Sequence, residues 1–130
     1  GTTLLWDERY GTSFKDMPFL QAAVLITRII SKPKEGVICL DLGHKAVAPE
    51  MNFPRVKIFG LEDAEQTGQS EEHLVLHYAK SETLKIGDIF YAIPMHICPT
   101  VAKYSKVLTV EDGKITGAWK IAARDHQMQI

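Results

Sequence analysis

The chain has 130 residues, which is the size of one domain with its own hydrophobic core. Fifteen basic residues against sixteen acidic residues give a formal net charge of −1, which excludes a basic nucleic-acid-binding surface as the leading interpretation. Hydrophobic residues make up 45% and charged residues 24%, a composition that excludes a disordered chain. Only 8% of the residues are aromatic, which also argues against an oligonucleotide-binding β-barrel.

The cysteines and the apolar runs bear on the cellular compartment. Cys39 and Cys98 are too few for a disulfide framework, and a Cys39–Cys98 bridge is the one disulfide that their number allows. The longest apolar run, residues 22–26, is far shorter than the roughly 20 residues that cross a bilayer. No basic segment followed by an apolar one indicates an export signal. We therefore expect a reduced, cytoplasmic protein that binds neither membrane nor nucleic acid.

Short runs of apolar and β-branched residues, bounded by glycine, proline or acidic residues, dominate the chain. They predict seven strands, over residues 22–30, 37–41, 55–59, 73–78, 88–93, 106–110 and 114–121. The last two flank Asp112-Gly113, a dipeptide typical of a tight hairpin turn. Seven short strands at nearly even spacing predict an all-β, mainly antiparallel fold, either a Greek-key barrel or a sandwich.

Helical signals are weak, and we expect at most short helical turns. Residues 62–70 are polar and contain a glycine, which favours a loop or a single turn. Residues 100–104 can form a short turn that starts at a Pro-Thr pair. Residues 11–18 have neither a helical nor a strand period and are expected to be extended. Without repeats or linkers, we expect a leading segment over residues 1–20 and a single β domain over residues 21–130.

The densest chemical signal is Pro94-Met95-His96-Ile97-Cys98-Pro99-Thr100. On an extended strand, side chains two positions apart point to the same side, so His96 and Cys98 can reach one point together. Imidazole nitrogen and thiolate sulfur are both zinc ligands, and a pair of ligands leaves positions open, as catalytic zinc sites do. The alternative is a packed histidine beside an inert, buried thiol, and both interpretations stay open at this point.

Other candidate residues carry weaker signals. His73 and His77 are four positions apart, but the Leu-Val-Leu between them predicts a strand, so two solvent-facing histidines are expected. Lys45 follows a predicted strand and is a Schiff-base lysine only in principle, since a surface lysine is the expected outcome. Glu71 and Glu72 are expected in a solvated loop. Neither a glycine-rich phosphate loop nor a Gly-x-Ser-x-Gly motif is present.

Four motifs follow each other in a characteristic order: residues 40–46 (Leu-Asp-Leu-Gly-His-Lys-Ala), 71–73 (Glu-Glu-His), 87–88 (Gly-Asp) and 94–100 (Pro-x-His-x-Cys-Pro-Thr). In this order and spacing they resemble the C-terminal part of the D-serine dehydratase and D-threonine aldolase family. Residues 14–16 and the tail over residues 119–124 are similar to the same region. The resemblance covers nearly the whole chain, from about the tenth residue to the end.

The resemblance implies a pyridoxal-phosphate enzyme related in architecture to alanine racemase. In that family an N-terminal α/β barrel carries the cofactor lysine and the phosphate site, and a C-terminal β domain completes the active site. The resemblance makes His96 and Cys98 metal ligands, and a His/Cys pair is similar to the zinc-dependent D-serine dehydratases. The implied metal binds the β-hydroxyl group of a small D-amino acid, and the implied parent enzyme is a homodimer.

Two hypotheses of function follow. In the first, the chain is the metal-binding C-terminal β domain of a larger D-amino-acid lyase and is inactive alone, because the barrel lies outside these residues. In the second, the chain is a stand-alone β-barrel module without catalysis, and His96 and Cys98 are merely packed. The coding sequence upstream of Gly1 discriminates between them, since a β/α pattern with a strand-end lysine would indicate the enzyme. Whether the parent is an aldolase or a dehydratase stays open.

Overall fold

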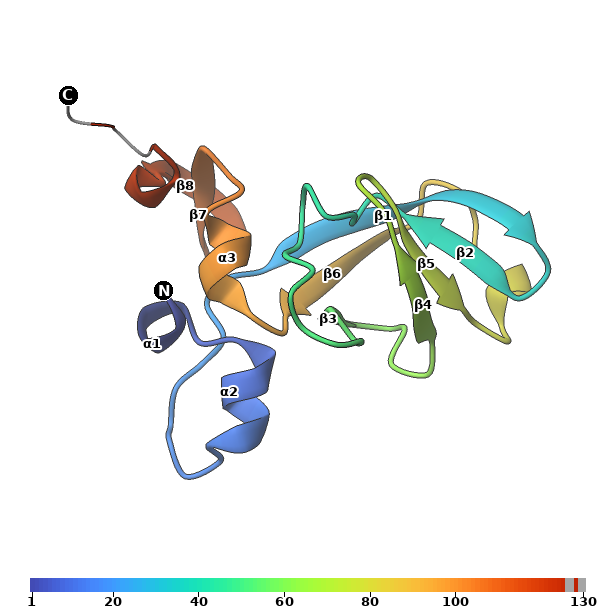
Figure 1. Cartoon of the computed structure of the whole chain (residues 1–130), viewed down its shortest axis with the longest axis horizontal. Helices are drawn as coiled ribbons and strands as arrows, with labels where there is room; N and C mark the ends of the chain where they lie inside the picture. Colours follow the sequence, from blue (N-terminus) through green and yellow to red (C-terminus); the bar gives the residue numbers. More distant parts are fainter. Residues whose placement is uncertain (126–127, 129–130) are drawn as a thin grey trace.

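The computed structural model describes residues 1–125 and 128. Antiparallel β-strands make up most of the regular secondary structure, as predicted from the sequence. The strands are β1 (Leu25–Lys34), β2 (Val37–Leu40), β3 (Val56–Ile58), β4 (Glu65–Gln69), β5 (Leu74–His77), β6 (Ile89–Pro94), β7 (Lys106–Glu111) and β8 (Lys114–Lys120). The first six pair in the order β3-β6-β1-β2-β5-β4, and β7 and β8 form a separate hairpin. Figure 1 shows the curled six-stranded sheet at one end of the molecule and the hairpin at the other.

Three short helices lie at the same end of the molecule as the hairpin. They are α1 (Thr2–Leu5), α2 (Glu8–Ser13) and α3 (Ile97–Val101), and two 3-10 turns cover Ser81–Thr83 and Ala122–Arg124. Figure 1 shows α1 and α2 near α3, although 80 or more residues separate them along the chain. In the described part of the chain, no helix is both long and apolar enough to cross a membrane.

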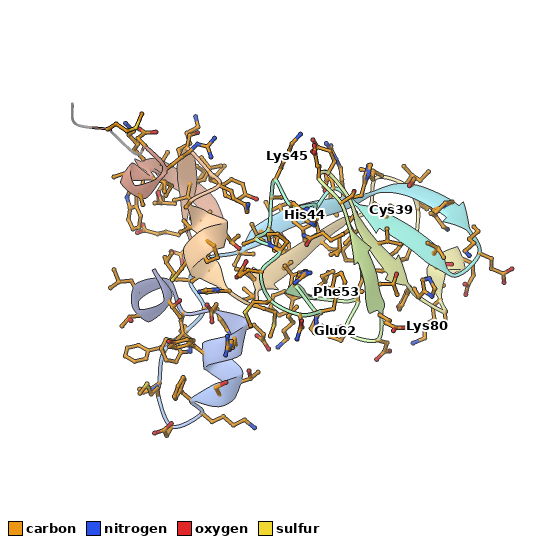
Figure 2. All side chains as sticks on the ribbon, viewed as in Figure 1. Cys39, His44, Lys45, Phe53, Glu62 and Lys80 are labelled. Atoms are coloured by element: carbon orange, nitrogen blue, oxygen red, sulfur yellow. The ribbon has the colours of Figure 1, made fainter. Side chains whose placement is uncertain are left out.

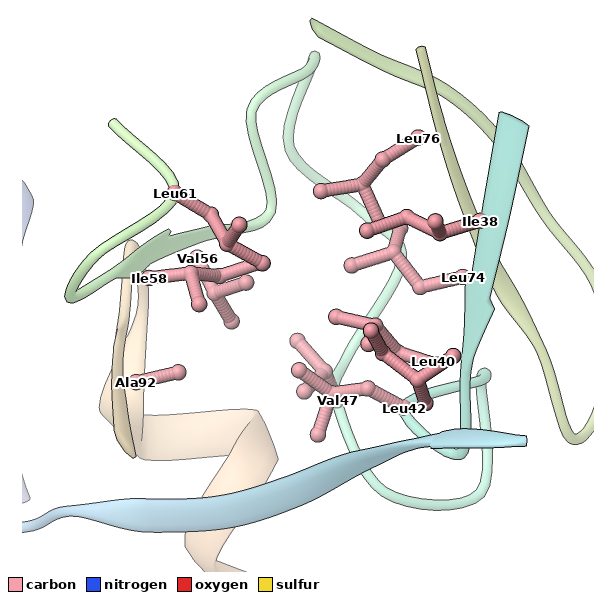
Figure 3. Close-up of a cluster of buried hydrophobic side chains, with 11 residues drawn as sticks. Ile38, Leu40, Leu42, Val47, Val56, Ile58, Leu61, Leu74, Leu76 and Ala92 are labelled. Carbon is pink, nitrogen blue, oxygen red and sulfur yellow. The ribbon is translucent and has the colours of Figure 1, made fainter. Parts of the chain in front are cut away.

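The hydrophobic core lies inside the curl of the six-stranded sheet. Val56 and Ile58 of β3 face Leu74 and Leu76 of β5 across the interior, and Figure 3 shows these two sides of the cluster. All four side chains are at most 3% exposed. Burying each of them contributes about 1.5–3 kcal/mol, so the alternation of apolar and polar residues in these strands fixes which face points inward.

The side chain of Gln66 bridges β4 to β3, the two strands that end the sheet. Its Oε1 accepts a hydrogen bond from the Arg55 backbone N–H at 2.8 Å, and its Nε2 donates to the Val56 carbonyl at 2.6 Å. One side-chain amide therefore satisfies a backbone donor and a backbone acceptor, as a neighbouring strand would. The curled sheet is thus linked at the place where a closed barrel would have backbone pairing.

Two strand predictions are corrected. The prediction of a loop over residues 62–70 is wrong, because these residues contain β4, which pairs with β5. The end of the first strand is also wrong, since β1 continues through Pro33 to Lys34. Register shifts bend β1 after Ile29, and Pro33 lies beyond the segment that pairs with β6, so its missing N–H interrupts no ladder on that side.

The helix predictions also need correction. Residues 11–18 are not extended throughout, because α2 covers the first three of them. The Asp7 side chain accepts a hydrogen bond from the Tyr10 backbone N–H at 3.0 Å and caps the start of this helix. The turn predicted over residues 100–104 starts earlier, since α3 begins at Ile97.

The loop after β2 and the turn between β4 and β5 bring two of the sequence motifs together. The backbone N–H groups of Gly43, His44 and Lys45 donate to carbonyl groups of residues 70–72 at 2.7–3.1 Å. A Cβ atom at Gly43 would lie 2.4 Å from the Glu71 carbonyl oxygen, so only glycine permits this approach. These motif residues hold two loops against each other.

Candidate metal-binding site

His96 and Cys98 lie at the start of α3. β6 ends at Pro94, His96 precedes the helix with an extended backbone, and Cys98 is the second helical residue. The extended backbone on which the two side chains were expected to share one side therefore ends before Cys98. Both residues nevertheless line the same hollow.

The His96 ring is oriented by a carboxylate. Its Nδ1 lies 2.7 Å from Glu50 Oε1. A carboxylate only accepts hydrogen bonds, so Nδ1 carries a proton, and in the neutral ring this leaves the lone pair of Nε2 free for a ligand. A histidine whose far nitrogen donates to a carboxylate is the usual arrangement of a metal-ligating histidine. Glu50 is 46 residues away in sequence, and no spacing rule predicts it.

The Cys98 sulfur is held by Thr2 of α1. The Thr2 hydroxyl lies 2.9 Å from Sγ, and the Thr2 backbone N–H donates to Sγ at 3.3 Å. The hydrogen bond with the Thr2 hydroxyl is the largest influence on the pKa of Cys98. Together with the Thr2 N–H and His96, it lowers that pKa below the ordinary thiol value despite partial burial. These contacts favour the thiolate, the form that binds metal ions.

Cys98 is an exposed, free thiol, which does not match the alternative of an inert, buried one. Cys39 is also free and half-buried, so the single disulfide that the sequence allowed is not formed. Figure 2 shows Cys39 in the curled sheet, away from the three helices.

A buried carboxylate connects the three helices beneath the pair. Asp7 is 1% exposed, and its Oδ2 accepts the backbone N–H of Ile97 at 3.0 Å. The same oxygen accepts the Thr2 hydroxyl at 3.4 Å, while Oδ1 accepts the Tyr10 N–H. Because α3 has no capping side chain of its own, Asp7 satisfies its first N–H group from another part of the chain.

An open hollow of about 560 Å³ lies in front of the pair. Its lining includes Arg9, Tyr10 and Phe14 from α2 and the residue after it, together with His96 and Cys98. Tyr10 and Phe14 stack with ring centroids 5.1 Å apart and form an aromatic wall. Arg9 approaches the Met51 sulfur at 3.4 Å and, within the described residues, forms no ion pair with a carboxylate.

The donor set fits a zinc ion in an open site. A neutral imidazole with a free Nε2 and a thiol with a lowered pKa are the two ligand types that zinc prefers. Within residues 1–125 and 128, no group of three or more His, Cys, Asp or Glu side chains is arranged to hold a metal ion. A metal ion at this place would therefore have His96 and Cys98 as its ligands from this part of the chain.

The other sequence candidates lie outside this site. His73 and His77 are exposed on and beside β5, as predicted. Lys45 is exposed and forms ion pairs with Glu72 and Glu71, and Figure 2 shows it extending outward from its loop. Hydrogen bonds to Glu72 and Glu71 raise the pKa of Lys45, which is opposite to what a Schiff-base lysine needs. The expectation of a surface lysine is confirmed.

The fold and the site define a β domain that presents a histidine–thiol pair at the edge of an open hollow. Residues 22–110 match the model of the putative serine dehydratase domain, and the chain belongs to that family. The resemblance stated from the sequence motifs is thereby confirmed.

Two D-threonine aldolases align with almost the whole of this chain. D-threonine aldolase from Arthrobacter sp. is 28% identical over 127 residues, which are 95% of this chain and 33% of the aldolase. The crystal structure of D-threonine aldolase from Filomicrobium marinum has a TM-score of 0.82 at 21% identity, over 95% of this chain and 34% of that one. The chain spans about a third of the length of these relatives.

A dehydratase shares the same fold. D-threo-3-hydroxyaspartate dehydratase from Delftia sp. HT23 has a TM-score of 0.69 at 16% identity, over 93% of this chain and 38% of the dehydratase. Two further structures of a D-threo-3-hydroxyaspartate dehydratase carry alanine in place of a histidine and of a cysteine two positions later. The cysteine variant is in the metal-free form.

Proposed function

We propose that this chain is the C-terminal, metal-binding β domain of a pyridoxal-phosphate-dependent lyase that acts on β-hydroxy-D-amino acids. The observation that carries the proposal is the pair itself. His96 and Cys98 line one hollow, Glu50 orients the imidazole and Thr2 holds the sulfur. This is the donor set of an open zinc site in a chain that belongs to the serine dehydratase family.

The relatives support the substrate class. Threonine and 3-hydroxyaspartate, named in the two kinds of relative, are both amino acids with a hydroxyl group on the β-carbon. The dehydratase variants support the ligand pair, since replacing a cysteine two positions after a histidine accompanies a metal-free form in that protein. His96 and Cys98 have the same spacing here.

The rest of the proposed parent chain would supply the second cofactor. Because this chain spans about a third of its relatives, we assign the cofactor lysine and the phosphate site to an N-terminal barrel, and we expect the parent to be a homodimer. Pyridoxal phosphate, when bound there, supplies an electron sink for the bond broken at the substrate α-carbon. The chemistry that zinc supplies when bound is Lewis acidity toward the β-hydroxyl group.

The residues of this chain would bind and orient the substrate. Glu50 keeps the proton on His96 Nδ1, so that Nε2 remains a ligand. Arg9 is the cation in the lining of the hollow and is suited to a substrate carboxylate. The aromatic wall of Tyr10 and Phe14 borders the same space.

The test replaces one ligand in the full-length protein. We expect wild type to hold about one zinc ion per chain. We expect His96→Ala to lose that zinc and at least about a hundredfold of its turnover. The matched control is His73→Ala, an exposed histidine outside the hollow, which should keep both properties. Zinc content is measured by elemental analysis.

Turnover is assayed with saturating pyridoxal phosphate on two substrates. Glycine and acetaldehyde from D-threonine indicate an aldolase, while pyruvate and ammonia from D-serine indicate a dehydratase. Normal zinc content and turnover in His96→Ala would disprove the role of the pair. A full-length protein that acts on neither substrate and binds no zinc would support the stand-alone module instead.

A further inference from the structure

We propose that Thr2 and Asp7 are positioning residues that hold the Cys98 sulfur beside His96 for metal binding. This inference rests on the proposed function of the pair and assigns roles to two residues of the N-terminal helices. Both contribute through Cys98 and α3, and neither is proposed as a metal ligand.

The first argument is convergence of donors on the sulfur. Thr2 presents two donors to Cys98 Sγ, the hydroxyl at 2.9 Å and the backbone N–H at 3.3 Å. A metal-bound sulfur carries no hydrogen, so both Thr2 donors can point toward it. Hydrogen bonds to a thiolate orient the sulfur and change the charge that it carries. Both properties determine how strongly the sulfur binds a metal ion.

The second argument is the close approach of the chain before Thr2. A Cβ atom at Gly1 would lie 3.2 Å from Cys98 Sγ and 3.3 Å from its Cα atom. These distances are shorter than ordinary van der Waals contact. A glycine therefore lets α1 lie directly against the ligand residue, so that the Thr2 N–H reaches the sulfur.

The third argument is the buried carboxylate beneath Thr2. Asp7 is 1% exposed, and its Oδ2 accepts the Ile97 N–H at 3.0 Å. The same oxygen lies 3.4 Å from the Thr2 hydroxyl oxygen and accepts its hydrogen when that hydrogen is not directed at Sγ. A buried carboxylate is costly unless hydrogen bonds satisfy it, so its position is fixed by these donors. Asp7 thereby fixes the position of α1 relative to the first turn of α3.

The hydrogen count explains why a hydroxyl is suited to this place. The Thr2 hydroxyl has one hydrogen and two neighbours, the sulfur and Asp7. With a metal-bound sulfur the hydrogen turns toward Sγ. With a free thiol, the S–H donates to the hydroxyl oxygen and the hydroxyl hydrogen turns toward Asp7. Each hydrogen has an acceptor in both states, so loading the site leaves no buried group unpaired.

The test compares three threonine variants of the full-length protein. Thr2→Val keeps the shape and removes the hydroxyl, Thr2→Ser restores the hydroxyl, and Thr83→Val is the matched control outside the site. Zinc affinity is measured by competition with a chromophoric chelator. We expect Thr2→Val to bind zinc about tenfold more weakly, and Thr2→Ser and Thr83→Val to match wild type.

Cobalt substitution gives a signature that a merely structural role would not change. The sulfur-to-cobalt charge-transfer band should shift in Thr2→Val and return in Thr2→Ser, because the hydrogen bond acts on the sulfur itself. Equal zinc affinity and an unchanged band in Thr2→Val would overturn the role of Thr2 while leaving the ligand pair intact. If wild type bound no zinc, the proposed function would fail first.

Asp7 is tested without metal. In Asp7→Asn one carboxylate oxygen becomes an NH2 group, which places a donor against the N–H of Ile97 or of Tyr10. We expect hydrogen–deuterium exchange of the segment that contains α3 to rise about tenfold in the metal-free protein, with Asp16→Asn as the control. Unchanged exchange in Asp7→Asn would refute the proposed role of Asp7, whether or not zinc binds.

Discussion

At the scale of single residues, the two candidate ligands are held by partners of different chemistry. His96 has a charged partner, Glu50, which accepts the ring proton at 2.7 Å. Cys98 has a neutral partner, Thr2, which offers hydrogens to the sulfur. The two partners suit the two ligands. An imidazole ligand needs one nitrogen without a proton, and a thiolate needs hydrogen-bond donors that stabilise its negative charge.

Replacing Glu50 tests the orientation of the imidazole. In Glu50→Gln the amide oxygen can still accept the Nδ1 proton, but the negative charge is lost and the ring becomes a weaker base. We expect zinc affinity to fall about tenfold without loss of folded protein, because the Glu50 side chain is 41% exposed. Chelator competition measures the affinity, and Glu35→Gln, an exposed position in the turn after β1, is the control. Equal affinities would contradict this role.

Asp41 is a residue whose charge stabilises the sheet. Burial alone raises its pKa. Hydrogen bonds from the Arg28 backbone N–H, the Thr27 hydroxyl and the Arg28 side chain outweigh burial and place the pKa below the usual value of 3.8. A carboxyl with a lowered folded-state pKa contributes stability above its unfolded pKa. That contribution is lost as the pH falls through the folded pKa.

We therefore expect Asp41→Asn to lose about 1–2 kcal/mol of unfolding free energy at neutral pH. The difference from wild type should shrink as the pH falls below 3.8, the unfolded value, because wild-type Asp41 then becomes neutral as well. Urea unfolding over a pH series measures both effects. Asp63→Asn is the control, since that carboxyl is 80% exposed and its ion pair is at the surface. A difference that stayed constant at all pH values would rule out the charge as its origin.

At the scale of elements, β4 is the strand that the sequence did not predict. Its residues, Glu65–Gln69, are polar and contain Gly68, so no alternation of apolar residues marks them. They form a strand because they pair with β5, whose Leu74 and Leu76 are fully buried. Backbone pairing with β5, rather than burial of its own side chains, stabilises β4. The apolar pattern of a single sequence does not show which segments pair in this way.

The sequence did not predict α1 and α2, and it predicted the start of the turn at α3 too late, for a related reason. Four to six residues are too few to display a helical period, and isolated helices of this length are unstable in water. α2 depends on the Asp7 cap, and α3 depends on the same carboxylate. The Asp7-Glu8 pair was a readable start signal for α2, since an acidic cap followed by an acidic residue is favourable at a helix N-terminus.

Gln66 provides the test at this scale. Gln66→Ala removes two hydrogen bonds and leaves the Arg55 N–H and the Val56 carbonyl without their partner. We expect a loss of about 2 kcal/mol of unfolding free energy, seen as a lower urea midpoint at an unchanged m-value. Thr67→Ala, the neighbouring exposed position on β4, should stay within about 0.5 kcal/mol of wild type. Equal midpoints for the two variants would mean that the bridge does not stabilise the sheet.

At the scale of the whole molecule, the site joins segments that are far apart in sequence. The spacing of His96 and Cys98 was visible in the sequence because both residues lie in one short motif. Their partners were not, since Thr2 lies 96 residues from Cys98 and Glu50 lies 46 residues from His96. Contacts of this kind depend on the packing of α3 against α1, which the local sequence does not contain.

The hairpin prediction succeeded because its signal is local. Asp112 and Gly113 both have positive φ angles, 48° and 73°, which the two central residues of this turn type require. The register next to the turn, with Glu111 opposite Lys114 and Val110 opposite Ile115, follows from that turn. An irregularity between Thr109 and Val110 then shifts the register of the rest of the hairpin. Fold class and hairpin are therefore readable from neighbouring residues, while the site depends on long-range contacts.

The amide of Gln66 has a second consequence, which concerns contacts between molecules. β3 and β4 end the six-stranded sheet, and an end strand with free N–H and carbonyl groups is a template on which another chain can add. Gln66 occupies the Arg55 N–H and the Val56 carbonyl at the place where such a chain would begin to pair. A single polar side chain thus removes one backbone donor and one backbone acceptor from those that a second chain would need to add at this edge.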